Sequence, residues 1–209
     1  VRQTLSRCAG AAKTFTITVK PTPIVTNPGN QSVCADGSTS LVTFTGAITG
    51  TTYDWTNDET GTGLAASGTG NIVSFTGVNG GTTDLVSTIT VTPTLNSCPG
   101  TSETFTITVK PTPTVTNPGN ESICEDGSTT LVTFSGAVSG TTYDWTNDET
   151  GTGLAASGTG NIASFTGVNG GTTDLVSTIT VTPTLNSCPG ASETFTCLLY
   201  TSPSPRDGL

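Results

Sequence analysis

Short runs of alternating apolar and polar residues fill this chain, separated by turns rich in Gly, Pro, Asn and Asp. In residues 104–110, Phe105, Ile107 and Val109 occupy every second position, and threonines stand between them. Successive side chains of a β-strand point to opposite faces, so this run predicts a half-buried strand. No segment shows a helical period of useful length. The pattern therefore predicts an all-β protein.

The same alternation predicts the third strand and its aromatic core anchors. In residues 51–56 it places Tyr53 and Trp55 on one face, and Tyr143 and Trp145 share a face in the same way further on. About seven strands in ninety residues, with a Trp on the third, fit a two-sheet immunoglobulin-like sandwich. The strands predicted in residues 21–110 lie at 24–26 with 31–34, then at 41–45, 51–56, 72–76, 85–92 and 104–110.

The chain is one unit written twice. Residues 14–103 recur as residues 104–193, with ten of the ninety positions changed. Self-similarity at a fixed period predicts a tandem array. Lys-Pro-Thr-Pro at 20–23 predicts a stiff linker, because each Pro fixes its own φ and biases the preceding residue away from helix. We expect one repeat at 21–110 and a second at 111–196. Residues 1–20 align with 91–110 and are expected to end a preceding, truncated repeat.

The last residues, 197–209, leave the repeat pattern. Residues 194–196 still match 104–106, but Cys-Leu-Leu-Tyr then stands where Ile-Thr-Val-Lys is expected. This tail resembles a translated sequencing adapter, so we expect it to be an artefact outside the fold, with a genuine divergent C-terminus as the alternative. The second repeat would then have a truncated, less ordered final strand.

Composition narrows the class of function. Threonine supplies 49 of the 209 residues, with 26 Gly and 12 Pro, which is typical of strands and turns. The formal net charge is −9, and residues 111–196 contain no Lys or Arg, so a polyanionic partner such as nucleic acid is excluded on electrostatic grounds. No apolar run approaches the roughly 20 residues that span a bilayer, so no membrane insertion is expected of this fragment.

Four segments together resemble the PKD-like repeats of large bacterial surface proteins. They are TTYDWTND at 51–58, GLAASGTG at 63–70, ITVTP at 89–93 and TFTITV at 104–109. The likeness covers the chain from its first residue to residue 196. It implies a non-catalytic, secreted module that is often arrayed and serves as a spacer or adhesive segment.

Cysteines recur at two positions in each repeat. Cys34 and Cys124 precede an Asp-Gly turn, whereas Cys98 and Cys188 lie in an Asn-Ser-Cys-Pro-Gly turn. The equal spacing favours the bridges Cys34–Cys98 and Cys124–Cys188, which imply an oxidising, extracellular setting. These two turns lie at opposite ends of a simple immunoglobulin topology, while bridged Cα atoms must come within about 7 Å. A bridge between neighbouring repeats, from Cys34 to Cys188, therefore stays open.

Acidic residues gather near the end of the third strand. Carboxylates are calcium ligands, but the spacing matches no EF-hand loop, and a solvated acidic turn is the favoured interpretation. No hydrophobic pocket that would raise a carboxyl pKa is evident, so we expect no catalytic residues, no cofactor and no enzyme activity. The calcium candidates of lower rank are Asp54, Asp58, Glu59, Asp144, Asp148 and Glu149.

The sequence thus favours a non-catalytic spacer region of a secreted or cell-surface bacterial protein, such as an adhesin stalk. The expected partners are neighbouring repeats of the same chain, with surface glycans or other cell-surface proteins as further candidates. The alternatives are a module that binds glycans or calcium, and an accessory spacer of a secreted hydrolase.

Overall fold

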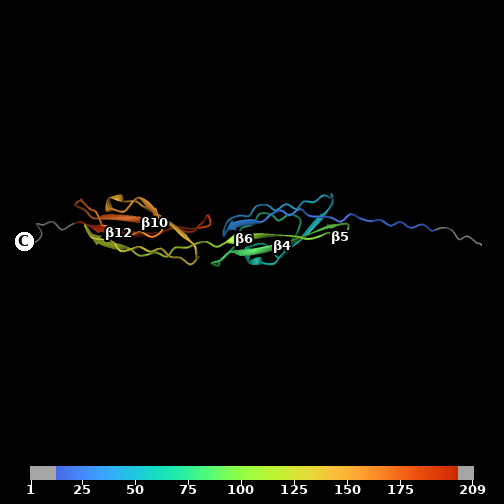
Figure 1. Ribbon diagram of the computed structural model, residues 1–209, viewed down its shortest axis with the longest axis horizontal. Coiled ribbons are helices and arrows are strands. Elements are labelled where there is room, and N and C mark those ends of the chain that lie inside the picture. The colour runs from blue at the N-terminus through green and yellow to red at the C-terminus, as the bar shows by residue number, and fades with distance from the viewer. Residues whose placement is uncertain (1–12, 202–209) are drawn as a thin grey trace, which may run out of the picture.

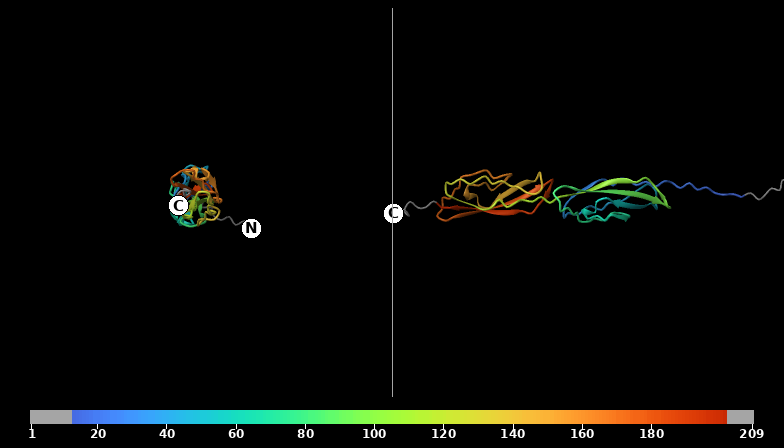
Figure 2. Two further views of the ribbon diagram at one scale, coloured as in Figure 1. Left: turned by 90° about the vertical axis from the view of Figure 1, so that its left-hand side faces the viewer. Right: turned by 90° about the horizontal axis from the view of Figure 1, so that it is seen from below.

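Two β-sandwich bodies lie end to end in the computed structural model, which describes residues 13–201 (Figure 1). Viewed along the long axis, the two bodies stack one behind the other within a single narrow outline (Figure 2, left). The predicted fold class, all-β with tandem immunoglobulin-like sandwiches, is confirmed. We call the body that ends at Lys110 the first copy and the body that ends at Tyr200 the second copy.

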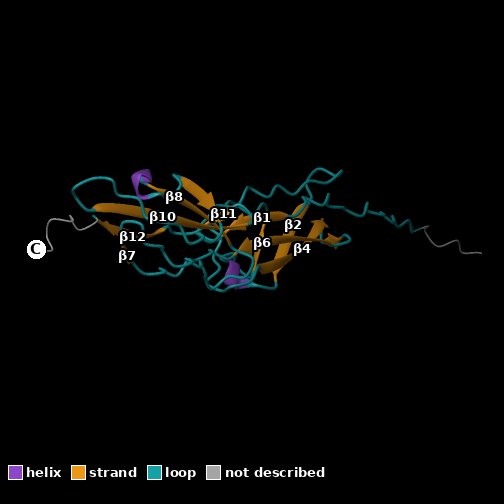
Figure 3. Ribbon diagram, turned by 60° about the vertical axis from the view of Figure 1, so that its left-hand side comes forward, coloured by secondary structure: helices purple, strands orange, loops and turns teal. Residues whose placement is uncertain are grey.

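Each copy has six strands and one short 3-10 turn. In the first copy these are β1 (Gln31–Cys34), β2 (Thr52–Asn57), η1 (Thr60–Thr62), β3 (Ser67–Thr69), β4 (Leu85–Leu95), β5 (Cys98–Pro99) and β6 (Glu103–Lys110). In the second copy they are β7 (Glu121–Cys124), β8 (Thr142–Asn147), η2 (Thr150–Thr152), β9 (Ser157–Thr159), β10 (Leu175–Leu185), β11 (Cys188–Pro189) and β12 (Glu193–Tyr200). Figure 3 shows that strands and loops make up nearly all of both bodies.

One hydrogen-bonded sheet forms the main layer of each copy. Its order in the first copy is β1-β6-β4-β2-β3, with β5 paired to β4, and the second copy repeats that order. β1 runs parallel to β6, so that Cys34 stands beside Lys110, and the other pairs are antiparallel. This parallel pairing brings the end of β1 to the end of the whole copy.

The facing layer is held by isolated bridges in place of long strands. Ser38 pairs with Thr76 and Val42 pairs with Ile72, so the strands predicted at 41–45 and 72–76 are reduced to single contacts. Side chains take over part of the ladder: Asn71 Oδ1 accepts the Phe44 N–H at 3.0 Å. Two short strands outside the predicted ranges, β3 and β5, bring the count to six for each copy, slightly below the predicted seven.

The core lies between these layers and follows the predicted alternation. Ile89 and Val91 of β4 and Ile107 of β6 have no exposed surface, while the residues between them stay partly exposed. Trp55 joins this cluster and Tyr53 packs against it. A Cβ placed on Gly68 of β3 would lie only 2.3 Å from the Trp55 ring, so the bare glycine backbone forms one wall of the Trp pocket.

The final strand of the second copy is complete, which corrects the expectation that it is truncated at residue 196. β12 continues to Tyr200 and pairs with β7 in the register that β6 keeps with β1. Cys197 and Leu199 occupy the inward positions and are buried, with Leu199 at 0% exposure. The reason is that Cys-Leu-Leu-Tyr still places apolar residues at every second position. The predicted loss of order at this edge is therefore wrong.

Candidate functional site

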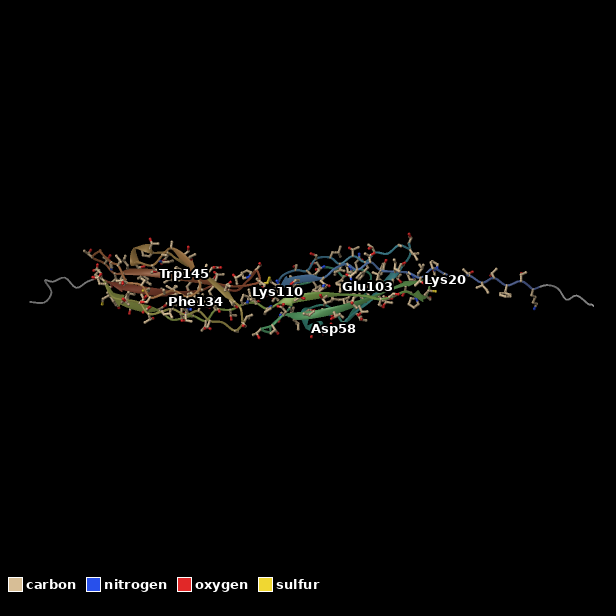
Figure 4. All side chains as sticks on the ribbon, in the orientation of Figure 1. Lys20, Asp58, Glu103, Lys110, Phe134 and Trp145 are labelled. Carbon is tan, nitrogen blue, oxygen red and sulfur yellow. A yellow bond between two sulfur atoms is a disulfide. The ribbon has the colours of Figure 1, made fainter. Side chains whose placement is uncertain are left out.

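The junction between the copies holds the one disulfide in the described part of the chain. Cys34 is joined to Cys188, 154 residues further on, with their Cα atoms 5.6 Å apart. Lys110, where the first copy ends, lies between the two bodies in Figure 4. The bridges predicted within each copy, Cys34–Cys98 and Cys124–Cys188, are not formed. The pairing between neighbours, which the sequence left open, is the one observed.

Strand topology explains this correction. Cys34 stands opposite Lys110 at the end of β6, whereas Cys98 precedes β6 and pairs with Leu95 at its opposite end. The eight residues of β6 span roughly 25 Å at about 3.3 Å per residue. That separation is several times the Cα distance that a disulfide can bridge. The two cysteines of one copy therefore lie at its opposite ends, although their spacing along the sequence is the same in both copies.

The turn that carries Cys188 is shaped to reach backwards to the first copy. Asn186 and Ser187 both have positive φ, at 47° and 68°, in the two-residue connection between β10 and β11. Two left-handed residues are the mark of a type I′ hairpin, which matches the natural twist of the flanking strands. Lys110 Nζ donates to the carbonyl oxygen of Asn186 at 3.2 Å, adding a polar contact beside the disulfide.

The linker packs against the same end of the second copy. Pro111 and Pro113 are both buried. A Cβ on Gly190 would lie 1.8 Å from the Pro113 carbonyl oxygen, so only glycine allows the linker to pass this close. Sequence reasoning placed the linker but missed both Lys110 and Gly190 as junction residues. The exact recurrence of Lys-Pro-Thr-Pro and Cys-Pro-Gly in both copies was the available signal.

The acidic cluster of the first copy serves its own backbone. Asp58 Oδ1 accepts the Thr88 N–H at 2.6 Å, and Glu59 Oε1 accepts the Gly61 N–H at 2.7 Å. The hydrogen bond from the Thr88 backbone holds the pKa of Asp58 below its ordinary value. Asp54 lies exposed on the outer face of β2. The structure therefore uses two of these three carboxylates as turn and strand caps.

The second copy repeats that arrangement. Asp148 Oδ1 accepts the Thr178 N–H at 2.6 Å, Glu149 Oε1 accepts the Gly151 N–H at 2.7 Å, and Asp144 lies exposed on β8. Within residues 13–201, no group of three or more His, Cys, Asp or Glu side chains is placed to hold a metal ion.

The four aromatic residues predicted as anchors lie in or against the cores. Trp55 and Trp145 are each 7% exposed, and their indole N–H groups have no hydrogen-bond partner. Tyr53 and Tyr143 are partly buried, and the Tyr53 ring lies 5.8 Å from that of Phe44. The buried indoles of the two Trp residues are thus not presented to a ligand at the surface.

The second copy also has a pocket of about 260 Å³ that is partly open to solvent. Part of its wall comes from β7 and β12, through Glu121 and Cys197, and part from the facing layer, through Val132. Burial raises the pKa of the Cys197 thiol, and the nearby Glu121 carboxylate raises it further. Glu121 and Cys197 are the two titratable side chains of this wall.

Searches against known proteins give likenesses at the level of structure only. No protein-family model matches the chain, and no curated protein matches it. No helix among residues 13–201 is long and apolar enough to cross a membrane.

Three solved structures illustrate the likeness. The I-band fragment I67–I69 of titin has a TM-score of 0.50 at 12% identity, over 88% of this chain and 66% of that fragment. The IG1+IG2 structure of DIP-gamma has a TM-score of 0.44 at 10% identity, over 86% of this chain and 98% of that one. Drosophila N-cadherin EC1–4 has a TM-score of 0.41 at 14% identity, over 88% and 50%. At these identities the titin fragment supports the immunoglobulin-like tandem fold, and the fold alone.

Proposed function

We propose that this chain is a structural spacer: a non-catalytic region of a secreted or cell-surface protein whose tandem sandwiches form a stiff rod. The observation that carries the proposal is the Cys34–Cys188 bridge, which joins consecutive copies rather than stapling one copy internally. The resemblance of residues 51–58 and 63–70 to PKD-like repeats supports the more specific form of the proposal, a stalk of a bacterial surface protein such as an adhesin.

The physical reason is that two covalent connections hold the junction. A peptide linker alone lets neighbouring domains pivot about it, and proline makes such a linker only semi-rigid. Here the chain passes from Lys110 to Pro111 at one point, and the disulfide ties Cys34 to Cys188 at a second. The Lys110–Asn186 hydrogen bond and the buried prolines fill the space between them. Such a junction resists bending and twisting.

An extracellular setting follows from the chemistry of the clamp. Disulfides persist in oxidising compartments and are rare where glutathione keeps thiols reduced. A spacer also needs no binding or catalytic site. In agreement with this, four carboxylates accept hydrogen bonds from the backbone of their own copy: Asp58, Glu59, Asp148 and Glu149.

Small-angle X-ray scattering of the full chain tests the stiffness. We expect the oxidised protein to show one narrow distance distribution, and Cys34→Ser to broaden it and reduce the longest dimension as the copies pivot. Cys98→Ser is the matched control, since it removes the same residue type at the unbridged position and should change nothing. A distribution that is the same with and without the Cys34 thiol would contradict the clamp.

Binding experiments test the spacer against the alternative of a ligand-binding module. Calorimetry with calcium and a glycan array should both show no binding to the oxidised chain. Binding of either at micromolar strength would overturn the spacer function. If calcium binds, Asp54→Asn and Asp144→Asn would show whether the exposed strand carboxylates are responsible.

A further inference from the structure

The two outer ends of the molecule carry unbridged copies of the cysteines that clamp the junction. Cys98 is the counterpart of Cys188, and Cys124 is the counterpart of Cys34, each at an offset of ninety residues. Both are free thiols in the structure. The equivalent positions of the repeat, Cys34 and Cys188, are bridged at the junction.

The end that carries Cys98 already has the shape of a junction. Asn96 and Ser97 have positive φ, at 47° and 64°, as Asn186 and Ser187 do. Lys20 Nζ donates to the Asn96 carbonyl oxygen at 3.1 Å, which reproduces the contact of Lys110 with Asn186. Lys20 lies at this far end of the first copy in Figure 4.

The segment that brings Lys20 to this end indicates what kind of neighbour would fit there. Residues 14–20 repeat the sequence of residues 104–110, most of β6, without a change. Phe15, Ile17 and Val19 correspond to core residues of that strand, yet each is at least 80% exposed here. A segment with the sequence of β6, but outside any sheet, therefore lies near the turn that carries Cys98, where the final strand of a neighbouring copy would lie.

The end that carries Cys124 is preformed in the same way. Cys124 stands opposite Tyr200, as Cys34 stands opposite Lys110. The following turn closes with a hydrogen bond from Gly127 N–H to the Cys124 carbonyl at 2.9 Å, against 3.0 Å for Gly37 and Cys34. The thiol is thus presented on the same backbone whether or not a partner is present.

Burial distinguishes the occupied face from the open ones. Cys188 is 1% exposed at the junction, whereas Cys98 is only partly buried. Cys34 is partly buried and Cys124 is exposed. Val138, in the loop before β8, is buried, while its counterpart Ile48 is only partly buried. The surfaces covered at the junction are therefore open at the two ends.

We propose that each outer end is a docking surface for another copy of this repeat, locked by the same disulfide. Cys124 bonds to the counterpart of Cys188 in the copy that follows, and Cys98 bonds to the counterpart of Cys34 in the copy that precedes. The inference deepens the spacer function and rests on it. The rod is then a chain of sandwiches in which every junction, not one alone, is covalently clamped.

The bond-forming step balances by thiol–disulfide exchange. One cysteine thiolate attacks a small disulfide such as oxidised glutathione, which forms a mixed disulfide and releases one glutathione. The second cysteine thiolate then attacks the mixed disulfide, which forms the protein disulfide and releases the other glutathione. The protein loses two protons and two electrons, and the oxidant leaves as two thiols. Cys197 does not compete, because its thiol is buried in the core of the second copy.

Two lengthened chains test the proposal. One carries an additional copy of residues 104–193 after Glu193, and the other carries an additional copy of residues 14–103 before Thr14. Each is refolded with a mixture of reduced and oxidised glutathione, alkylated, and mapped without reduction. We expect Cys124 in the first chain to be bonded to the added counterpart of Cys188, and Cys98 in the second to the added counterpart of Cys34, each with at least tenfold loss of free-thiol labelling.

The same maps separate failure of this inference from failure of the spacer function. If Cys34–Cys188 is intact while Cys124 and Cys98 remain fully labelled, the outer ends do not accept a repeat. If Cys34–Cys188 is itself absent, the spacer function fails as well. Cys124→Ser in the first chain should free the added counterpart of Cys188, whereas Cys98→Ser should leave that junction unchanged. A Cys124 bridge to any other cysteine would also overturn the proposal.

Discussion

The two copies are almost the same sequence, yet they differ at the inward positions of their final strands. Both build the same sheet in the same register, but the first copy ends β6 with Ile107 and Val109, and the second ends β12 with Cys197 and Leu199. Cys197 lines a partly open pocket of about 260 Å³, whose wall also includes the exposed Leu131. Alternation of apolar residues is thus sufficient to place a strand, whereas the volume of each side chain determines how completely the space behind it is filled.

A second difference lies at the edge of the same region. Gln31 of the first copy both donates to the Ser40 carbonyl and accepts its N–H, at 3.2 and 3.0 Å. In the second copy Glu121 accepts the Thr130 N–H at 2.7 Å, but a carboxylate has no N–H to donate in return. Val42 is accordingly buried, while its counterpart Val132 is only partly buried.

The largest expected effect comes from removing the disulfide that joins the two copies. Cys34→Ser breaks the bridge that closes a loop of 154 residues, for which the chain-entropy model gives at most about 5 kcal/mol. We expect a clear fall in the urea midpoint of the oxidised chain, and separate unfolding of the two copies. Cys98→Ser should leave the midpoint within error, and an equal fall in both variants would show that the bridge is not the cause.

Gly68→Ala should destabilise the first copy by about 1–3 kcal/mol, the usual cost of overpacking. The added methyl would lie 2.3 Å from Trp55, and the same distance separates Gly158 from Trp145. Gly158→Ala should therefore cost the second copy the same amount, as measured by thermal unfolding. Gly80→Ala, where no atom lies within 4 Å, is the control. A much smaller cost in the second copy would mean that its side chains rearrange to accept the added methyl group.

Strands and core could be predicted because they depend on local alternation. The inward positions at Trp55 and Ile107 follow from a period of two residues, and so does the end of β12. The segment from Cys197 to Tyr200 departs from the repeat but keeps apolar residues at the inward positions, so β12 continues through it. Strand existence depends on pattern, not on identity with the neighbouring copy.

The disulfide could not be fixed from the sequence, because it depends on which end of a strand each cysteine reaches. Only the parallel pairing of β1 with β6 brings Cys34 beside Lys110, and that pairing is a property of the assembled sheet. The weak facing layer was equally hidden, since side-chain hydrogen bonds such as that of Asn71 to Phe44 replace part of its ladder. The disulfide pairing and the facing layer both depend on contacts between residues far apart in the sequence.

Exchanging the two residues that differ in the core should move stability between the copies. Cys197→Ile adds buried apolar volume and should stabilise the second copy by about 1 kcal/mol, while Ile107→Cys should destabilise the first by a similar amount. Urea unfolding of the two variants measures both changes. If Cys197→Ile stabilises the second copy but Ile107→Cys does not destabilise the first, the residue at this position does not explain the difference in stability between the copies.

The smallest expected effect is a dependence on pH that belongs to the second copy alone. Burial, and then the Glu121 carboxylate, raise the pKa of Cys197 above its ordinary value of 9.0. The folded state therefore favours the neutral thiol, and this contribution is complete below about pH 9 and is lost as the pH rises through the folded pKa. Ile107 cannot titrate, so the first copy has no such loss. The stability difference between Cys197→Ile and the unaltered chain should widen from pH 8 to pH 10.5. Glu121→Gln, which restores the residue of the first copy and removes one cause of the raised folded pKa, should make this widening smaller. A difference that stays constant over this range would show that folding does not shift the pKa of the Cys197 thiol and that the two copies differ by volume alone.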